Sequence, residues 1–270
     1  MSPETYELLK AIYSYDPGYP LNAQTVGELQ HDGVRFEKFA FDSFHDGKVP
    51  GLLALPEQAA GPVGVVLLLH GVSGNKRQWL GDDFTHGGEV TKALLNRGIG
   101  ILALDAQYHG ERAINNNFVD PAEMAFVRGW GVRYANMLTQ SVVDYRRAID
   151  WLVSRDDINA DKVGLLGYSM GGHMAFILGA VEKRIRARAA CVVPDIPGLP
   201  MAAMNFAQDM ADAPLLMMMG KNDPNYTLAQ ANELYEAVPG DAKTLRLYDS
   251  GHSLPVEYAE TAANWLSEQL

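Results

Sequence analysis

The amino-acid sequence predicts an α/β protein, a three-layer αβα sandwich built on a mostly parallel sheet of about eight strands. From Gly64 onward, short runs rich in valine, isoleucine and leucine alternate with segments of helical period. Runs such as GVVLLLH and GIGILALD are continuously apolar, which is typical of parallel strands buried on both faces. Before Gly64, two runs separated by HDGK predict an antiparallel N-terminal hairpin, Val34 to Phe41 and Lys48 to Leu55.

The remaining elements follow from the same alternation. The other strands are expected at Val65 to Leu69, Ile99 to Leu104, Val163 to Gly167, Ala189 to Val193, Leu215 to Met219 and Thr244 to Tyr248. Helices are expected at Gly88 to Asn96, Met137 to Ser154, Met170 to Val181, Tyr226 to Ala237 and Pro255 to Leu270, after a short helix and turn before Pro20. Because no linker, repeat or low-complexity tract interrupts them, we expect one domain over residues 1–270.

Two connections, residues 106–136 and 194–213, are longer than a compact domain needs. Both follow the carboxyl end of an expected strand, which is where ligands bind in open α/β sheets, so both are candidates to cover a pocket. In the second connection, four apolar side chains are spaced as one helical face, which suits either a lid helix or a helix packed on the core. They are Met201, Met204, Phe206 and Met210.

Composition narrows the classes of partner. The formal net charge is −11, spread along the chain, so nucleic acid and anionic membranes are not expected to bind. We interpret the basic cluster of Lys183, Arg184, Arg186 and Arg188 as a solvated helix end. The first twenty residues have no signal-peptide pattern, and the longest apolar runs are far shorter than the roughly 18 residues that span a bilayer. The single cysteine, Cys191, fits a reducing compartment, and the expected location is the cytoplasm.

The segment KVGLLGYSMGGHMAF contains the pattern G-x-S-x-G around Ser169, between an expected strand and an expected helix. The pattern predicts a strained turn in which Gly167 and Gly171 lack side chains so that strand and helix can approach closely. Ser169 would then stand at a helix N-terminus, which favours negative charge. The alternative is a glycine-rich turn with a serine as helix cap.

A serine hydroxyl becomes a strong nucleophile when a histidine accepts its proton and a carboxylate orients that histidine. Two histidines follow Ser169 in the chain. His173 lies one helical turn further along the same helix and is expected to be a packed or partly exposed helix residue. His252, in the loop YDSGHSLP between the last strand and the last helix, is therefore the predicted base.

Three aspartates compete for the acid position. Asp223 follows the strand Leu215 to Met219 in a loop of turn-forming residues, and it is the favoured candidate. Asp195, one strand earlier, is its rival. Asp249 is too close to His252 in sequence to reach behind the imidazole ring easily.

Acyl transfer also needs two N–H donors that stabilise the oxyanion. Met170, directly after the serine, is expected to supply one through its backbone. The loop HGVSGNK, which begins with His70 and Gly71 after the strand Val65 to Leu69, is expected to supply the other from Val72.

Together, HGVSGNK, DAQYHGER, GYSMGGH, GKND and GHSLP resemble the α/β-hydrolase superfamily, within it the dienelactone hydrolase-like and small serine carboxylesterase branch, over about residues 33–270. The resemblance implies an α/β-hydrolase fold with Ser169, His252 and Asp223 as catalytic residues and Val72 and Met170 as backbone donors. It also implies a cofactor-free hydrolase of small to medium esters. Dienelactone hydrolases usually carry cysteine at the nucleophile position, so Ser169 makes the chain more similar to ester-cleaving members.

No zinc or nucleotide motif is present, and neither a metal nor a cofactor is expected. His109 with Glu111, and His86 with Glu89, are interpreted as solvated loop residues. Asp105 and His109 are expected to shape the pocket wall or brace the loop. The alternatives to an esterase are a peptidase, amidase or acyltransferase on the same fold, and a non-catalytic binding protein; a homodimer is left open.

Overall fold

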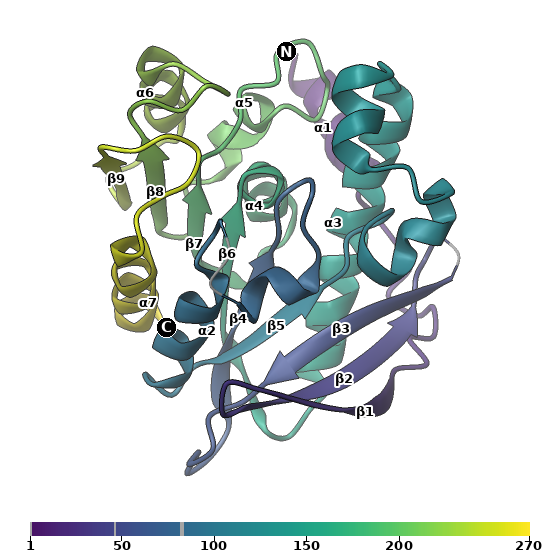
Figure 1. Cartoon of the computed structure of the whole chain (residues 1–270). Coiled ribbons are helices and arrows are strands. Elements are labelled where there is room, and N and C mark those ends of the chain that lie inside the picture. Colours follow the sequence, from purple (N-terminus) through teal and green to yellow (C-terminus); the bar gives the residue numbers. More distant parts are fainter. Residues whose placement is uncertain (1, 46, 82–83) are drawn as a thin grey trace.

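A computed structural model describes residues 2–45, 47–81 and 84–270, and a nine-stranded sheet runs through the centre of the molecule (Figure 1). The strand order is β1-β2-β3-β5-β4-β6-β7-β8-β9. The strands are β1 Gln24–His31, β2 Val34–Asp42, β3 Lys48–Ala54, β4 Val63–Leu69, β5 Gly100–Leu104, β6 Ile158–Tyr168, β7 Ile185–Cys191, β8 Leu215–Gly220 and β9 Lys243–Tyr248.

The predicted pattern of pairing is confirmed. β2 and β3 form the antiparallel hairpin, with Phe39 opposite Gly51, although Asp46 of the HDGK segment lies outside the described residues. From β5 to β9 in the sheet order all neighbours are parallel. Every residue of β4 is buried, as expected for a central strand with helices on both faces.

β1 was not expected from the sequence, and it makes the sheet one strand larger than predicted. β1 pairs antiparallel with β2 at the edge of the sheet, and its residues are exposed or only partly buried. Its polar sequence, QTVGELQH, carries no buried apolar alternation because backbone pairing rather than a core-facing side chain holds it there.

Helices cover both faces of the sheet (Figure 1). α2 and α7 pack against each other on one face, and α3 and α4 pack against each other on the other. α3 begins earlier than the predicted Met137 and so takes up the end of the first long connection. The helices are α1 Pro3–Ala11, α2 Gly87–Leu95, α3 Gly131–Val153, α4 Met170–Val181, α5 Ala203–Phe206, α6 Leu228–Ala237 and α7 Glu257–Gln269.

Short helical turns fill the rest of the long connections. The 3-10 turn η2 and the π-helical turn η3 lie in residues 106–136, and η4 follows α5 in residues 194–213. A further 3-10 turn, η1, follows β4. Their bounds are η1 Lys76–Trp79, η2 Gly110–Asn116, η3 Glu123–Val127 and η4 Ala207–Asp209.

The four apolar residues of the second connection do not share one helix. Met201, Phe206 and Met210 are buried, and the Phe206 ring packs edge-on against Tyr6 and Tyr13. Met204, in contrast, is 38% exposed. Three of the four therefore pack in the core, as in the second predicted arrangement, but they do so from separate segments and not as the face of one helix.

The prediction of a solvated basic cluster is wrong for Arg188. Its side chain is fully buried on β7, where Nη1 donates to the carbonyl oxygens of Met210 and Ala213 and Nη2 pairs with Asp212. Arg184 forms ion pairs with Asp150 and Glu182. Asp150 and Asp212, which are distant in sequence, help to neutralise these cations, so composition alone could not place them.

In the described part of the chain, no helix is both long enough and apolar enough to cross a lipid bilayer.

Candidate active site

Ser169 sits between the carboxyl end of β6 and the first residue of α4, in a strained backbone conformation with φ 56°. The strain is possible because strand and helix approach closely around it. A Cβ on Gly167 would lie 2.0 Å from the Gly171 oxygen, and one on Gly171 would lie 2.0 Å from the Leu69 oxygen. The predicted tight turn is confirmed, and its glycines have the steric reason that the pattern implied.

Ser169, His252 and Asp223 lie in hydrogen-bond contact although they come from three different loops. The Nε2 atom of His252 is 2.8 Å from Ser169 Oγ. The Nδ1 atom of the same ring is 2.6 Å from Asp223 Oδ2, and the Asp223 side chain is fully buried. The other carboxylate oxygen of Asp223 accepts the Asn225 N–H at 2.8 Å, which holds the carboxylate in place.

The other candidates for the acid and the base have different partners. Asp195 accepts a hydrogen bond from Gln230 on α6, and Asp249 accepts one from Asn222. His173 is fully buried in α4, and its Nε2 contacts the carbonyl oxygen of Met201. Burial lowers the pKa of His173, so this imidazole is a packed core residue.

Tyr168 braces the loop that carries His252. The Tyr168 hydroxyl donates to the His252 carbonyl oxygen at 2.8 Å and accepts the Leu254 N–H at 3.0 Å. Tyr168 was not predicted from the sequence, because it occupies an unspecified position of the G-x-S-x-G pattern. Its place next to the serine is the signal that could have indicated it.

The two predicted oxyanion donors also lie beside Ser169. Met170 is the first residue of α4, so no carbonyl within that helix accepts its N–H. Val72 belongs to a loop that passes directly over the serine, since a Cβ on Gly71 would be 3.7 Å from Ser169 Cβ. The Gln78 side chain holds this loop by accepting the Gly71 N–H at 3.0 Å.

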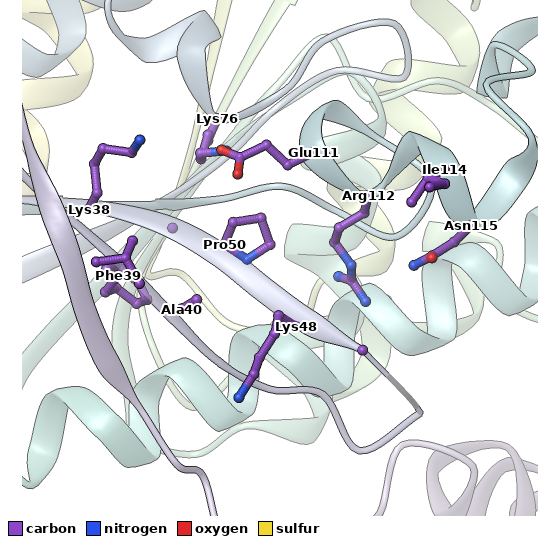
Figure 2. A pocket seen from close by; sticks show the side chains of 13 residues that line it. Lys38, Phe39, Ala40, Lys48, Pro50, Lys76, Glu111, Arg112, Ile114 and Asn115 are labelled. Carbon is purple, nitrogen blue, oxygen red and sulfur yellow. The ribbon is translucent and has the colours of Figure 1, made fainter.

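A buried ion pair ties this loop to the one after β5. Asp105 is fully buried and accepts hydrogen bonds from the backbone N–H of Lys76 at 2.9 Å and from Lys76 Nζ at 2.6 Å. Lys76 Nζ also contacts the exposed Glu111 carboxylate at 2.6 Å, and Figure 2 shows the two side chains pointing toward one another. Asp105 therefore braces the loop, as predicted.

The prediction that His109 is a solvated loop residue is wrong, whereas the prediction that it braces a loop is confirmed by its contact with Val72. Its side chain is buried, and its two ring nitrogens contact the carbonyl oxygens of Gln107 and Val72. Burial is the main cause that lowers the pKa of His109. The sequence could not show that His109 is buried, because its burial depends on how residues 106–136 fold over the Val72 loop.

Two of the molecule's cavities, one beside β2 and one beside α6, lie apart from the three contacting side chains. One of about 330 Å³ lies beside β2, β3 and η2, and Lys38, Lys76 and Arg112 are among the residues that line it (Figure 2). Another of about 620 Å³ lies between α6 and residues 193–205. Neither is lined by Ser169, Asp223 or His252.

Cys191 is fully buried on β7, and burial raises the pKa of its thiol. It is therefore a neutral packing residue and not a thiolate nucleophile. Among the residues that the structure describes, no group of three or more histidine, cysteine, aspartate or glutamate side chains is arranged to hold a metal ion.

Comparison with known proteins places the chain in a family. The family model described as Dienelactone hydrolase family matches residues 49–266, which is most of the chain. The chain belongs to the dienelactone hydrolase family. The match extends from β3 to α7 and so includes every loop at which Ser169, Asp223, His252, Val72 and Met170 lie.

Two proteins of Bacillus subtilis (strain 168), both named hydrolases, are similar to this family member over part of its length. YtaP is 26% identical over 172 residues, which cover 62% of this chain and 56% of YtaP. MhqD is 28% identical over 173 residues, which cover 57% of this chain and 84% of MhqD. The chain thus matches only about half the length of YtaP.

Solved structures share the fold. A cold-adapted esterase from an Arctic intertidal metagenomic library matches with a TM-score of 0.74 at 22% identity, over 92% of this chain and 99% of the esterase. An acetyl xylan esterase from Paenibacillus sp. R4 matches with a TM-score of 0.75 at 19% identity, over 99% of this chain and 94% of that protein. The predicted α/β-hydrolase fold is therefore confirmed.

Proposed function

We propose that this protein is a serine hydrolase that cleaves small to medium carboxylic esters through an acyl-enzyme intermediate. The observation that carries the proposal is the chain of contacts from Ser169 Oγ through the His252 ring to Asp223, at 2.8 Å and 2.6 Å. Membership of a hydrolase family and the fold shared with proteins named esterases favour ester substrates.

The hydrogen bonds imply one protonation pattern. The buried Asp223 carboxylate accepts a hydrogen bond from His252 Nδ1, so Nδ1 carries the hydrogen and Nε2 presents its lone pair to Ser169 Oγ. Ser169 Oγ attacks the ester carbonyl carbon while its proton moves to His252 Nε2. The N–H groups of Val72 and Met170 stabilise the oxyanion that forms.

The attack gives a tetrahedral intermediate that carries this oxyanion. Its collapse breaks the bond to the alcohol oxygen, and the alcohol leaves with the proton from His252 Nε2. The acyl group stays on Ser169 Oγ. A water molecule then attacks the acyl carbonyl and gives a proton to His252, and that proton returns to Ser169 when the carboxylic acid leaves. The reaction therefore consumes one ester and one water molecule and releases one alcohol and one carboxylic acid.

The experiment that tests this proposal is covalent labelling with a fluorophosphonate, followed by peptide mapping. Such a reagent reacts with a serine only when a base activates it. We expect the label on Ser169 and a loss of labelling in His252→Ala, with labelling retained in His173→Gln. A folded protein that stays unlabelled would favour a non-catalytic binding protein instead.

Comparing matched ester and amide substrates then separates an esterase from a peptidase or amidase. We expect hydrolysis of the ester and no measurable turnover of the matched amide, because the alcohol is the better leaving group and a site that is not built for amides does not overcome the difference. A preference for the amide would contradict the proposal of an esterase while leaving the serine mechanism intact.

A further inference from the structure

Two buried histidines hold the backbone on both sides of Val72. The carbonyl oxygen of Gly71, which precedes Val72, is 2.8 Å from His70 Nδ1. The carbonyl oxygen of Val72 itself is 2.6 Å from His109 Nε2. The two rings lie edge to face, with centroids 4.8 Å apart, so they form one packed unit beneath the loop.

The hydrogen bonds of His70 determine its tautomer. The Ala106 N–H donates to His70 Nε2 at 3.1 Å, so Nε2 holds a lone pair and the hydrogen is on Nδ1, which donates to the Gly71 oxygen. In a planar trans peptide the C=O and N–H groups point in opposite directions. Holding the Gly71 oxygen on the His70 side therefore aims the Val72 N–H away from His70.

That N–H is free to act as a donor. Within residues 2–45, 47–81 and 84–270, the Val72 N–H has no hydrogen-bond acceptor, and its loop lies against Ser169. The Gly71 oxygen also accepts the Gly74 N–H at 2.9 Å, which closes the turn after Val72. The next peptide unit, from Val72 to Ser73, is held by His109 through the Val72 carbonyl oxygen.

His109 reaches this unit from a different part of the chain. It follows β5, whereas Val72 follows β4, and it is buried among the Asp105 brace, His70 and the Val72 loop. Both of its nitrogens face carbonyl oxygens, Val72 at 2.6 Å and Gln107 at 2.9 Å, and carbonyl oxygens only accept. A neutral ring has one N–H, and the shorter contact indicates that it belongs to Nε2 and is donated to Val72.

We propose that His109 is a positioning residue for the oxyanion donor of Val72, because its Nε2–H fixes the peptide that follows Val72 while His70 fixes the peptide that carries the Val72 N–H. The inference rests on the proposed function. Without this bond the Val72–Ser73 peptide can rotate and Val72 loses one of the two anchors of its backbone. The Val72 N–H is then held less firmly and contributes less to the transition state. Substrate binding depends less on the donor, because the full negative charge forms only in the transition state.

The test uses variants that differ in their reach toward Val72. In His109→Gln the side-chain amide can donate at the position of Nε2, whereas His109→Leu fills similar space with no donor. We expect His109→Leu to lower kcat by at least about tenfold, toward the ~10²- to 10³-fold cost of a lost oxyanion donor, with KM within about threefold of wild type. His109→Gln should recover most of the loss, and the control variant His31→Gln, at a half-buried position on the edge strand β1, should match wild type.

The inhibition constant of a trifluoromethyl ketone distinguishes a positioning role of His109 from a purely structural one. The ketone adds to the serine and forms a tetrahedral oxyanion, so its affinity reports the oxyanion donors directly. We expect its inhibition constant to rise in His109→Leu by about the same factor as kcat falls, and to return toward the wild-type value in His109→Gln.

If His109→Leu does not fold, His109→Asn replaces it, since asparagine keeps a polar side chain but is one methylene too short to reach Val72. A folded Leu or Asn variant whose kcat and ketone affinity stay within about threefold of wild type overturns the inference. So does a loss that His109→Gln fails to recover. Retained activity in Ser169→Ala would instead overturn the proposed function itself, so the two failures are distinguishable.

Discussion

The His252 imidazole is 2.6 Å from the Asp223 carboxylate through Nδ1, although the two residues are 29 positions apart in the chain. The contact brings together the loops that follow β8 and β9, which are neighbours in the sheet. Tyr168 holds the His252 loop from the other side. In the sheet β8 lies between β6 and β9, so it is the loop after β9, held by Tyr168, that brings the histidine between the carboxylate and the serine.

This contact predicts that Asp223→Asn lowers kcat/KM for an ester substrate by about 10⁴-fold while the protein stays folded. The amide would favour the wrong tautomer of His252 and would not stabilise the imidazolium. Steady-state kinetics with a p-nitrophenyl ester, together with circular dichroism, measure both effects.

Asp195→Asn is the matched control, because Asp195 bonds Gln230 and not His252. We expect its kcat/KM to stay within about threefold of wild type. The assignment of Asp223 would fail if the two variants lost activity to the same extent.

Stability should fall as the solution becomes mildly acidic. Burial lowers the pKa of His70, His109 and His173, so the folded state keeps all three neutral. The unfolded chain binds protons at these positions below the ordinary value of about 6.5, so the free energy of unfolding decreases as pH falls from there. Guanidinium unfolding between about pH 7.5 and pH 5 measures the slope.

His173→Gln isolates one contribution to that slope, because glutamine can still donate to the Met201 carbonyl oxygen but does not titrate. Below about pH 6.5 the variant should lose up to about 1.4 kcal/mol per pH unit of the wild-type dependence. An unchanged slope would show that the buried imidazole does not couple to folding.

The buried pair of Lys76 and Asp105 should contribute strongly to stability. Lys76→Met leaves the Asp105 carboxylate buried and without its cation, which costs about 3–5 kcal/mol in the free energy of unfolding. Glu111→Gln removes a carboxylate whose side chain is 62% exposed, and it should cost less than about 1 kcal/mol. Urea unfolding compares them, and equal losses would contradict the role assigned to burial.

The sequence predicts the sheet, its helices and the loops of the candidate site because these features leave local patterns. Apolar runs indicate buried strands, and the glycines around Ser169 have a steric requirement that the structure meets. β1 leaves no such pattern, since it lies at an edge and buries little.

Features that depend on tertiary contacts could not be predicted from the sequence. Arg188 looks like part of a solvated charge cluster until β7 buries it against Asp212. His109 looks like a loop residue until residues 106–136 fold over the Val72 loop. In both cases the deciding partner comes from a different element of the chain.

The central claim is that Ser169 Oγ is the nucleophile, and the most direct measurement is kcat/KM of Ser169→Ala on a series of p-nitrophenyl acyl esters. The account predicts a loss of at least about 10⁴-fold on every ester, with an unchanged unfolding midpoint, because removing a catalytic nucleophile costs several orders of magnitude. Ser154→Ala, at an exposed serine at the end of α3, should match wild type. A folded Ser169→Ala protein within about tenfold of wild type would contradict the account.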